Sequence, residues 1–358
     1  MVKGEINVNK LMRTISLMFL LIISFGVLAA CGSNDNAKSE NNNQASDQEV
    51  YKLKMANQVD EQNFQNQGYV KFKEILEEKS DGRFEVEIYN GGTLVSSDEE
   101  TVDALNNGTL ELATVSAYGT ANTTSVDGLK IFDFPMLFKD RDEFYQIADN
   151  DLGDKLREQV AENSNVQALG YVDMGFYGIL NSKKNAEKPE DFKGLKIRSS
   201  TADLHLETLE AMGANPTPMA YPEIFTGLQQ GTIDGVTTST ALIYGDRFYE
   251  VAEHMTLTNH VLLPHLMLVN NDFYNGLPED LKAIFDEAAE EYIKHARNLT
   301  IEAETEAIEG MEAEGVEVIE LTDEQRETFV KAVEPVVEKH IDTIGKDIYE
   351  QALEELGK

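Results

Sequence analysis

ETVDALNNGTLELATVS (residues 100–116) and EIFTGLQQGTIDGVTTS (residues 223–239) align without a gap, and this internal repeat guides the interpretation of the fold. Each copy begins as a short helix, stops at a glycine and continues as a strand whose last residues are small and polar. The repeat predicts two similar α/β lobes. Because ligands bind beyond the carboxyl ends of strands in open α/β sheets, we expect the strand ends near Ser116 and Thr238 to face each other across a cleft.

Strands and helices alternate on either side of this repeat. Residues 51–55 and 84–88 alternate apolar and polar side chains, which predicts two strands, and residues 69–76 place their apolar side chains on one helical face. This βαβ pattern predicts a mainly parallel sheet with helices on both faces. Pro278 opens a long helix toward Ile308, and a strand and two amphipathic helices follow it.

The length of the chain predicts two folded domains. Residues 32–49 contain almost no apolar side chains, so they cannot bury a core and are expected to form a disordered tether. About 310 residues remain, more than one hydrophobic core usually organises. The predicted division is a leader (1–30), a tether including Cys31 (31–49), lobe I (50–174 plus about 264–303) and lobe II (175–263 plus about 304–358).

The N-terminus has the pattern of an export signal. Three basic residues precede an apolar run over residues 15–28, which is short for a stable membrane span. The run ends in Leu28-Ala29-Ala30-Cys31, which resembles the lipobox of bacterial lipoproteins. This resemblance implies an extracytoplasmic protein that is anchored to the cell membrane by acyl chains on Cys31 and does not span it. The alternative is an uncleaved anchor helix followed by an incidental cysteine.

The composition excludes several classes of protein. The formal net charge is −35, from 65 acidic and 30 basic side chains, which argues against nucleic acid or anionic lipid as partners. The acidic residues are spread through the predicted helices, as expected for a solvated surface. Cys31 is the only cysteine, so no intramolecular disulfide is possible.

Motifs for catalysis, metal binding and cofactor binding are absent. No two of the six histidines have the close spacing of a zinc helix, and there is no G-x-S-x-G, P-loop or G-x-G-x-x-G. We therefore expect no cofactor and no enzymatic activity. A secreted carbohydrate-active enzyme with paired carboxylates stays open as an alternative, because so many acidic residues must include close pairs.

One segment concentrates unusual chemistry. Asp191 to Ser200 runs from a loop into a strand that ends near Arg198. The planar guanidinium of arginine can hold a carboxylate with two parallel hydrogen bonds, and at the end of a strand it would point into the cleft. From the residues alone, a surface salt bridge explains Arg198 equally well.

Several motifs together resemble the solute receptors of tripartite ATP-independent periplasmic (TRAP) transporters, of the dicarboxylate-receptor type. The resemblance covers nearly all of the chain after Val50, and its motifs are specific in combination. They are SDGR (80–83), NGGTL (90–94), FPMLF (134–138), FKGLKIR (192–198), MGANPTPM (212–219) and EIFTGLQQGTIDG (223–235).

The resemblance implies a two-lobed receptor with a long connecting helix that closes around a small organic acid and delivers it to the membrane subunits of the transporter. By position, Arg198 matches the family arginine that pairs with the ligand carboxylate. Gln58 matches a cleft residue after the first strand, and Tyr221 matches an aromatic residue that packs on the ligand. Thr238 stands where many members have asparagine, and Ser116 stands at the opposite strand end, where sialic-acid receptors have an acidic residue. A monomer is expected.

Departures from the family pattern bear on the ligand. Tyr177 stands where many members carry a second arginine, and the hydroxyl of Thr238 replaces an amide. A pocket with one arginine and added hydroxyls suggests a monocarboxylate, such as a hydroxy acid, a keto acid or a sugar acid, and His265 would supply another polar contact. An ABC-type solute-binding lipoprotein remains the alternative receptor class, since it would share the lipobox, the tether and the two lobes.

Overall fold

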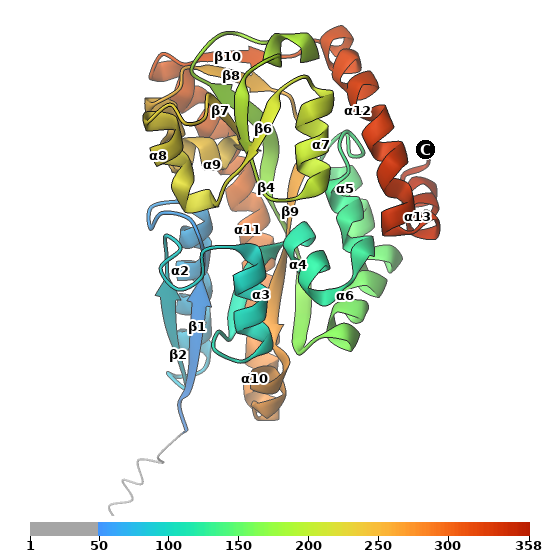
Figure 1. Cartoon of the computed structure of the whole chain (residues 1–358). Helices are drawn as coiled ribbons and strands as arrows, with labels where there is room; N and C mark the ends of the chain where they lie inside the picture. Colours follow the sequence, from blue (N-terminus) through green and yellow to red (C-terminus); the bar gives the residue numbers. More distant parts are fainter. Residues whose placement is uncertain (1–48) are drawn as a thin grey trace, which may run out of the picture. The chain divides into compact units, whose positions relative to one another are not determined.

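The computed structural model describes residues 49–358, so the predicted leader, Cys31 and residues 32–48 of the predicted tether lie outside the described residues. The described residues belong to one compact unit built on a mixed sheet with helices on both faces (Figure 1). The strands are β1 (Tyr51–Ala56), β2 (Phe84–Tyr89), β3 (Leu112–Ser116), β4 (Val166–Asn181), β5 (Lys196–Ser199), β6 (Asn215–Pro218), β7 (Gly235–Ser239), β8 (His254–Leu257), β9 (Leu262–Asn270) and β10 (Glu317–Glu320).

Helices lie between most of these strands. The helices are α2 (Phe64–Lys79), α3 (Asp98–Asn106), α4 (Ala117–Thr124), α5 (Arg141–Ala148), α6 (Asp151–Asn163), α7 (Asp203–Ala211), α8 (Ile224–Gln229), α9 (Thr240–Gly245), α10 (Asn271–Gly276), α11 (Glu279–Ala313), α12 (Asp323–Ile344) and α13 (Lys346–Leu356). Four short 3-10 helices are η1 (Asp127–Asp133), η2 (Pro189–Phe192), η3 (Tyr221–Glu223) and η4 (Phe248–Glu250).

The predicted βαβ unit is present at the start of the described chain. The side chain of Asn63 caps α2 by accepting a hydrogen bond from the amide of Gln65. After α2 the chain turns through Asp81 and Gly82, both at positive φ, which glycine adopts readily. Strands β1 and β2 then pair in parallel along their whole length, which confirms the prediction.

The strand order is β2-β1-β3-β9-β4-β7-β5-β6, with β8 beside β4 and β10 beside β8. Strand β4 has 16 residues and takes part in two half-sheets. Its first part pairs with β9. The first half-sheet consists of this part of β4 together with β1, β2, β3 and β9. From Tyr177 onward, β4 pairs with β7 and β8. The second half-sheet consists of this part of β4 together with β5, β6, β7, β8 and β10.

Each half-sheet has an apolar core on both of its faces. On the first half-sheet, α2 and α11 cover one face and α3 to α6 cover the other. On the second, α8, α9 and the end of α11 cover one face, and α7 and α12 cover the other. The α/β architecture with helices on both faces of two half-sheets agrees with the predicted fold class. The sheet is mixed and not mainly parallel, because the long strands β4 and β9 run antiparallel to the strands beside them.

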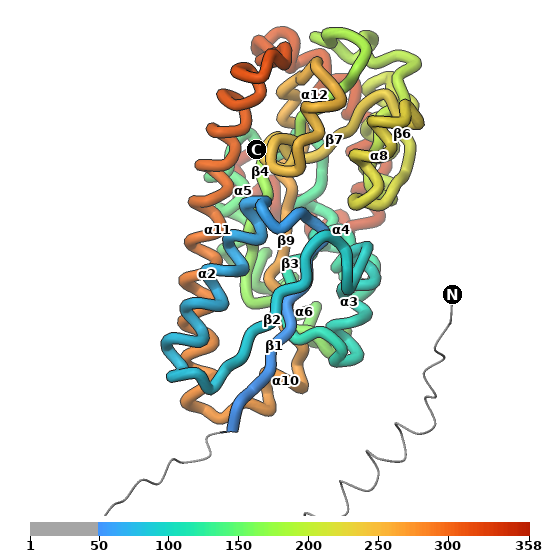
Figure 2. The backbone as a smooth tube through the Cα atoms, turned by 90° about the vertical axis from the view of Figure 1, so that its left-hand side faces the viewer, coloured from blue at the N-terminus to red at the C-terminus, as the bar shows by residue number. Residues whose placement is uncertain are grey.

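Helix α11 links the two half-sheets. It begins after Pro278, as predicted, and its 35 residues give it a length of about 50 Å at 1.5 Å per residue. Phe285 packs in a core of the first half-sheet, and Met311 packs in a core of the second. Figure 2 shows α11 running alongside both. The predicted long helix is therefore confirmed, and it continues to Ala313.

A buried ionic network lies where β4 passes from one half-sheet to the other. Asp173 is fully buried and accepts hydrogen bonds from Nε of Arg141 (3.2 Å) and from the hydroxyl of Tyr145 (2.6 Å). Arg141 also pairs with Glu304 of α11 at 2.6 Å. Gly175 has a φ of +99°, and a Cβ there would lie 2.8 Å from both Glu304 and Ser239, so only glycine fits this crossing.

The C-terminal helices contact both parts of the molecule. Phe329 and Val333 of α12 pack beside Phe192 in a core of the second half-sheet. Ile348 and Ala352 of α13 pack in the core beneath α5 and α6. The predicted assignment of residues 304–358 to one lobe, like the other lobe boundaries, stays a prediction.

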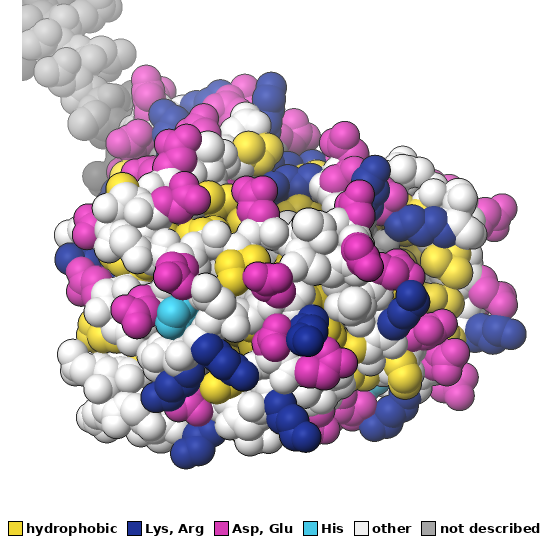
Figure 3. All heavy atoms as spheres, turned by 90° about the horizontal axis from the view of Figure 1, so that it is seen from above, with side chains coloured by type: hydrophobic (Ala, Val, Ile, Leu, Met, Phe, Trp, Pro, Cys, Tyr) yellow, Lys and Arg dark blue, Asp and Glu magenta, His cyan; other side chains and the backbone are white. Residues whose placement is uncertain are grey.

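The surface carries charges of both signs. On the face seen in Figure 3, Lys and Arg side chains lie among Asp and Glu side chains. Among the described residues, ion pairs such as Lys183–Asp234 and Arg247–Glu250 join charges of opposite sign. Within residues 49–358, no helix is both long enough and apolar enough to cross a membrane.

Candidate functional site

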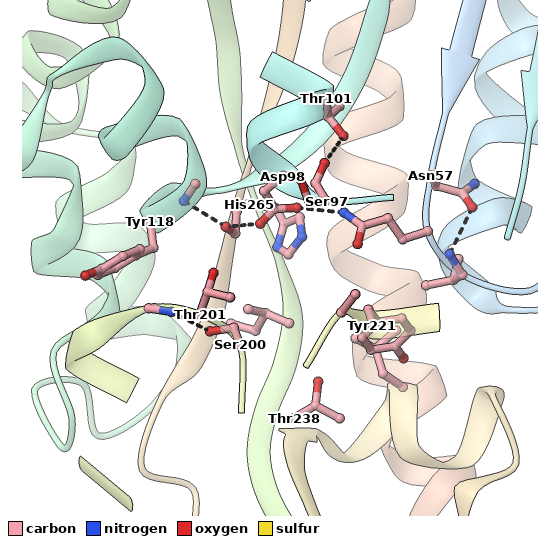
Figure 4. Close-up of a pocket in the computed structure, with 18 of the residues that line it drawn as sticks. Asn57, Ser97, Asp98, Thr101, Tyr118, Ser200, Thr201, Tyr221, Thr238 and His265 are labelled. Carbon is pink, nitrogen blue, oxygen red and sulfur yellow. Dashed lines mark hydrogen bonds between the residues drawn. The ribbon is translucent and has the colours of Figure 1, made fainter. Parts of the chain in front are cut away.

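A cavity of about 220 Å³ lies between the two half-sheets. All seven residues that were predicted to contact a ligand line it. In Figure 4, Asp98 and His265 lie on one side of the cavity and Thr238 and Tyr221 on the other. The predicted residues in the lining are Gln58, Ser116, Tyr177, Arg198, Tyr221, Thr238 and His265.

The internal repeat positions two strand ends at this cavity. Its two copies fold as α3-β3 and α8-β7, and the glycines between helix and strand, Gly108 and Gly231, both have φ near +70° (+72° and +68°). Ser116 ends β3 and caps α4, and Ser239 ends β7 and caps α9. The repeat is therefore structural, and Ser116 and Thr238 reach the same cavity as predicted.

Arg198 enters the cavity from β5 without an acidic partner. Its side chain is buried, with 6% of the residue exposed. Nε and one terminal nitrogen donate hydrogen bonds to the carbonyl of Met219 at 3.0 and 2.8 Å. No carboxylate of the described residues lies within ion-pair distance of Arg198, and burial lowers the pKa of its guanidinium. The surface salt bridge that the sequence left open is therefore not formed within residues 49–358.

Tyr221 lies over Arg198, with the guanidinium carbon 5.6 Å from the ring centre. Its hydroxyl donates a hydrogen bond to Oδ2 of Asp246 at 2.5 Å. Because this hydroxyl is already bonded, the ring face is the part of Tyr221 that remains for a ligand. This geometry suits the predicted packing role.

Asp98 is a cavity residue that sequence analysis missed. It accepts a hydrogen bond from Nε2 of Gln58 at 2.9 Å and another from the hydroxyl of Ser116. Ser116 also accepts a hydrogen bond from the amide of Gly119 at 3.0 Å, so its one O–H donor is already used and only a lone pair remains for a ligand. In the sequence, Asp98 follows the helix cap Ser97 and looks like one of several acidic residues in a first helical turn. Only the fold shows that it faces the cavity.

Two residues of the central strands complete the wall. The hydroxyl of Tyr177 makes no hydrogen bond with residues 49–358, and burial raises its pKa, so it stays protonated. Nδ1 of His265 is buried and has no hydrogen-bond partner among the same residues. Burial lowers the pKa of His265, which keeps the ring neutral at neutral pH.

His205 is a second cavity residue that the sequence did not reveal. Its Nε2 lies 2.9 Å from Oδ1 of Asp133, and its Nδ1 lies 3.0 Å from the hydroxyl of Ser200. Both ring nitrogens therefore have partners within the protein, and the ring packs edge-on against Tyr177. His205 shapes the wall of the cavity.

The cavity combines the guanidinium of Arg198, the carboxylates of Asp98 and Glu99, and several hydroxyl or neutral ring groups. Such a set can hold a carboxylate at one end and hydroxyl or carbonyl groups at the other. Within residues 49–358, no cluster of three His, Cys, Asp or Glu side chains could hold a metal ion.

Comparison with known proteins gives a consistent match. The model of bacterial extracellular solute-binding protein family 7 matches residues 55–343. The chain is 29% identical to the 2,3-diketo-L-gulonate-binding periplasmic protein of Escherichia coli, over 74% of this chain and 78% of that protein. Its fold resembles the sugar acid binding protein of Advenella mimigardefordensis in complex with galactonate, with a TM-score of 0.82, 27% identity and coverage of 87% and 99% of the two chains. It also resembles a TRAP periplasmic solute-binding protein from Shewanella oneidensis with bound succinate, with a TM-score of 0.80, 27% identity and coverage of 86% and 99%.

Proposed function

Because the chain belongs to bacterial extracellular solute-binding protein family 7, we propose that it is a TRAP receptor that captures a small organic acid and delivers it to the membrane subunits. The observation that carries this proposal is Arg198, a buried guanidinium that lines a cavity and has no acidic partner among the described residues. The family match favours the TRAP type over the ABC-type receptor that the sequence left open. The matched family is one of solute-binding proteins, the class of protein that the sequence predicted.

The physical argument rests on the cost of burying a charge. A guanidinium that leaves water loses solvation, and this loss is compensated only by hydrogen bonds and an opposite charge. The carbonyl of Met219 supplies hydrogen bonds to Arg198 but no negative charge. A ligand carboxylate would supply that charge through a paired, charge-assisted contact. The free energy gained would therefore favour ligand binding.

The opposite wall favours a ligand with one carboxylate and several hydroxyls. Asp98 offers acceptors for ligand hydroxyls and would repel a second carboxylate placed beside it. His265 is neutral, and Tyr177 is a phenol, so neither supplies a second positive charge. Relatives bind both galactonate and succinate, and this wall suits an acid of the galactonate type better than a dicarboxylate.

The proposal is tested by a thermal-shift screen of the purified protein against galactonate, other hydroxy and keto monocarboxylates, and succinate. A ligand at 100 times its Kd stabilises the folded protein by about 2.7 kcal/mol. We expect a stabilising acid among the monocarboxylates, a strongly reduced shift for that acid with Arg198→Ala, and an unchanged shift with Arg247→Ala, which removes an exposed arginine. Equal shifts for wild type and Arg198→Ala would contradict the assignment.

The site of action is proposed to be outside the cytoplasm, with the protein held to the membrane by lipid on Cys31. This part rests on Leu28-Ala29-Ala30-Cys31 following an apolar run, which lies outside the described residues. A Cys31→Ser protein should leave the membrane fraction or keep an uncleaved leader. Unchanged fractionation with a normally cleaved leader would show that Cys31 carries no anchor.

A further inference from the structure

Asp246 lies behind the cavity rather than in its lining, yet it holds a residue that the proposed ligand would touch. It follows α9, and its Oδ2 accepts the hydroxyl of Tyr221 at 2.5 Å. Phe248 packs on the same tyrosine ring, with the ring centres 5.9 Å apart. Tyr221 is therefore fixed from behind, and its orientation over Arg198 depends on Asp246.

The second oxygen of Asp246 contacts the segment between β1 and α2, which lies on the opposite side of the cavity from Tyr221. Oδ1 accepts Nδ2 of Asn63 at 3.0 Å and the backbone amide of Asp60 at 3.3 Å. Asp60 and Asn63 lie between β1 and α2, which belong to the first half-sheet, whereas Tyr221 belongs to the second. One carboxylate therefore joins segments from both sides of the cavity.

Two close approaches at glycines show that the walls touch at this rim. A Cβ on Gly245 would lie 2.8 Å from Nδ2 of Asn63. A Cβ on Gly92, which has a φ of +69°, would lie 2.9 Å from Cγ of Pro222, the residue after Tyr221. At Gly92 the positive φ and the rigid Pro222 ring require glycine, whereas a side chain at position 245 would force the end of the Asn63 side chain to shift.

The position of Asp246 is unfavourable unless all its donors are present. A carboxylate at the C-terminal end of a helix meets the negative end of the helix dipole, and partial burial removes some of its hydration. Hydrogen bonds from Tyr221, Asn63 and Asp60 compensate for these losses. Two of the three donors come from the first half-sheet, so the full set exists only while the walls are together.

We propose that Asp246 is a positioning residue for ligand binding, which aligns Tyr221 on Arg198 and is fully hydrogen-bonded only in the closed arrangement of the two walls. It thereby slows the release of the acid from the cavity. This role rests on the proposed function, because it acts on the residence time of the same ligand.

The test measures association and dissociation rates of galactonate for wild type and for variants that each remove one part of this link. Tyr221→Phe keeps the ring and deletes only the hydroxyl. Asn63→Asp keeps a good helix cap but places a carboxylate against Asp246. Each should raise the dissociation rate about tenfold and leave the association rate within about threefold, as expected for loss of one buried hydrogen bond.

A second tyrosine provides a matched control. Tyr274 donates its hydroxyl to Asp286 at 2.8 Å, away from the cavity, so Tyr274→Phe deletes a hydrogen bond of the same kind and should leave both rates unchanged. The effects of Tyr221→Phe and Asp246→Ala should not add, because both act through one contact. Asp246→Asn keeps one acceptor oxygen, so it should release galactonate more slowly than Asp246→Ala but faster than wild type.

The outcomes separate this proposal from the function on which it rests. If Arg198→Ala abolishes galactonate binding while Tyr221→Phe and Asn63→Asp release it at the wild-type rate, the receptor function stands and the role of Asp246 is wrong. If galactonate does not bind wild type, spin labels on cysteines at the exposed positions Glu78 and Lys193 measure the separation of the walls directly. A distance distribution that Asn63→Asp leaves unchanged would overturn the proposal, and a shift to longer distances would support it.

Discussion

Arg141 and Arg198 are both largely shielded from water, but their surroundings differ in charge. Arg141 lies at the crossing of β4, where burial lowers its pKa but the attraction of Asp173 and Glu304 outweighs burial and raises it overall. Arg198 lies at the cavity, where burial lowers its pKa and no adjacent carboxylate reverses the effect. A paired buried charge stabilises the fold that surrounds it, whereas an unpaired one at a cavity is available to a ligand.

The strongest test of this contrast is the removal of Arg141. Arg141→Ala leaves the fully buried Asp173 without a positive partner, so we expect a loss of about 3–5 kcal/mol in the free energy of unfolding. Urea unfolding measures this loss. Arg247→Ala removes an exposed pair with Glu250 and should leave stability nearly unchanged. If Arg141→Ala were as stable as Arg247→Ala, the proposed difference between the paired Arg141 and the unpaired Arg198 would be wrong.

In contrast to Arg141→Ala, Arg198→Ala should weaken ligand binding strongly and change the stability of the fold only slightly. Truncating one partner of a buried charged pair costs about 2–5 kcal/mol, or roughly 30-fold to several thousand-fold in Kd. Arg198→Lys keeps the charge without the planar fork and should recover only part of the loss. Calorimetry with the acid found in the screen measures both variants. A folded Arg198→Ala protein that binds within about threefold of wild type would place the carboxylate elsewhere.

His260 extends the comparison to a buried base that can lose its proton. Burial lowers the pKa of His260 to about 3, and its Nδ1 bonds with the hydroxyl of Thr258 at 2.7 Å. The pKa of His260 in the folded state lies below its value near 6.5 in the unfolded state. The stability that neutral His260 contributes is therefore complete above about pH 6.5 and is lost as the pH falls toward 3. The loss at pH 5 is about 2 kcal/mol.

Urea unfolding of wild type and His260→Gln at pH 8 and pH 5 isolates this contribution. The variant is expected to be less stable at pH 8 but to lose about 2 kcal/mol less than wild type on acidification. Equal pH dependence in the two proteins would mean that His260 titrates normally in the folded state.

The smallest expected effects concern hydroxyls. Those of Tyr177 and Thr238 line the cavity, whereas that of Tyr145 is bonded to Asp173 in the crossing network. Tyr177→Phe and Thr238→Val should change the ranking of bound acids by about fivefold each, or about 1 kcal/mol, with little change in stability. Tyr145→Phe should lower stability and leave the ranking intact. An unchanged ranking in both cavity variants would show that neither hydroxyl selects the ligand.

The amino-acid sequence by itself determined the local elements and the receptor family. The repeat over residues 100–116 and 223–239 predicted the two strand ends that meet at the cavity, because helix stops and strand ends depend on nearby residues. The alternation in β1 and β2 predicted their parallel pairing, and Pro278 marked the start of α11. Arg198 stood out because its segment matched a specific family motif, although its chemistry alone left a surface ion pair equally plausible.

Tertiary structure alone decided which side chains meet across the cavity. Asp98 is 40 residues from Gln58 and 18 from Ser116, and nothing in a first helical turn indicates that the three would share hydrogen bonds. Asp246 is 25 residues from Tyr221 and 183 from Asn63, and it meets both only because two half-sheets come together at the rim. The physical reason is that local sequence sets the conformation of each element. The partners of a buried polar group are set by the packing of elements that are far apart in the chain.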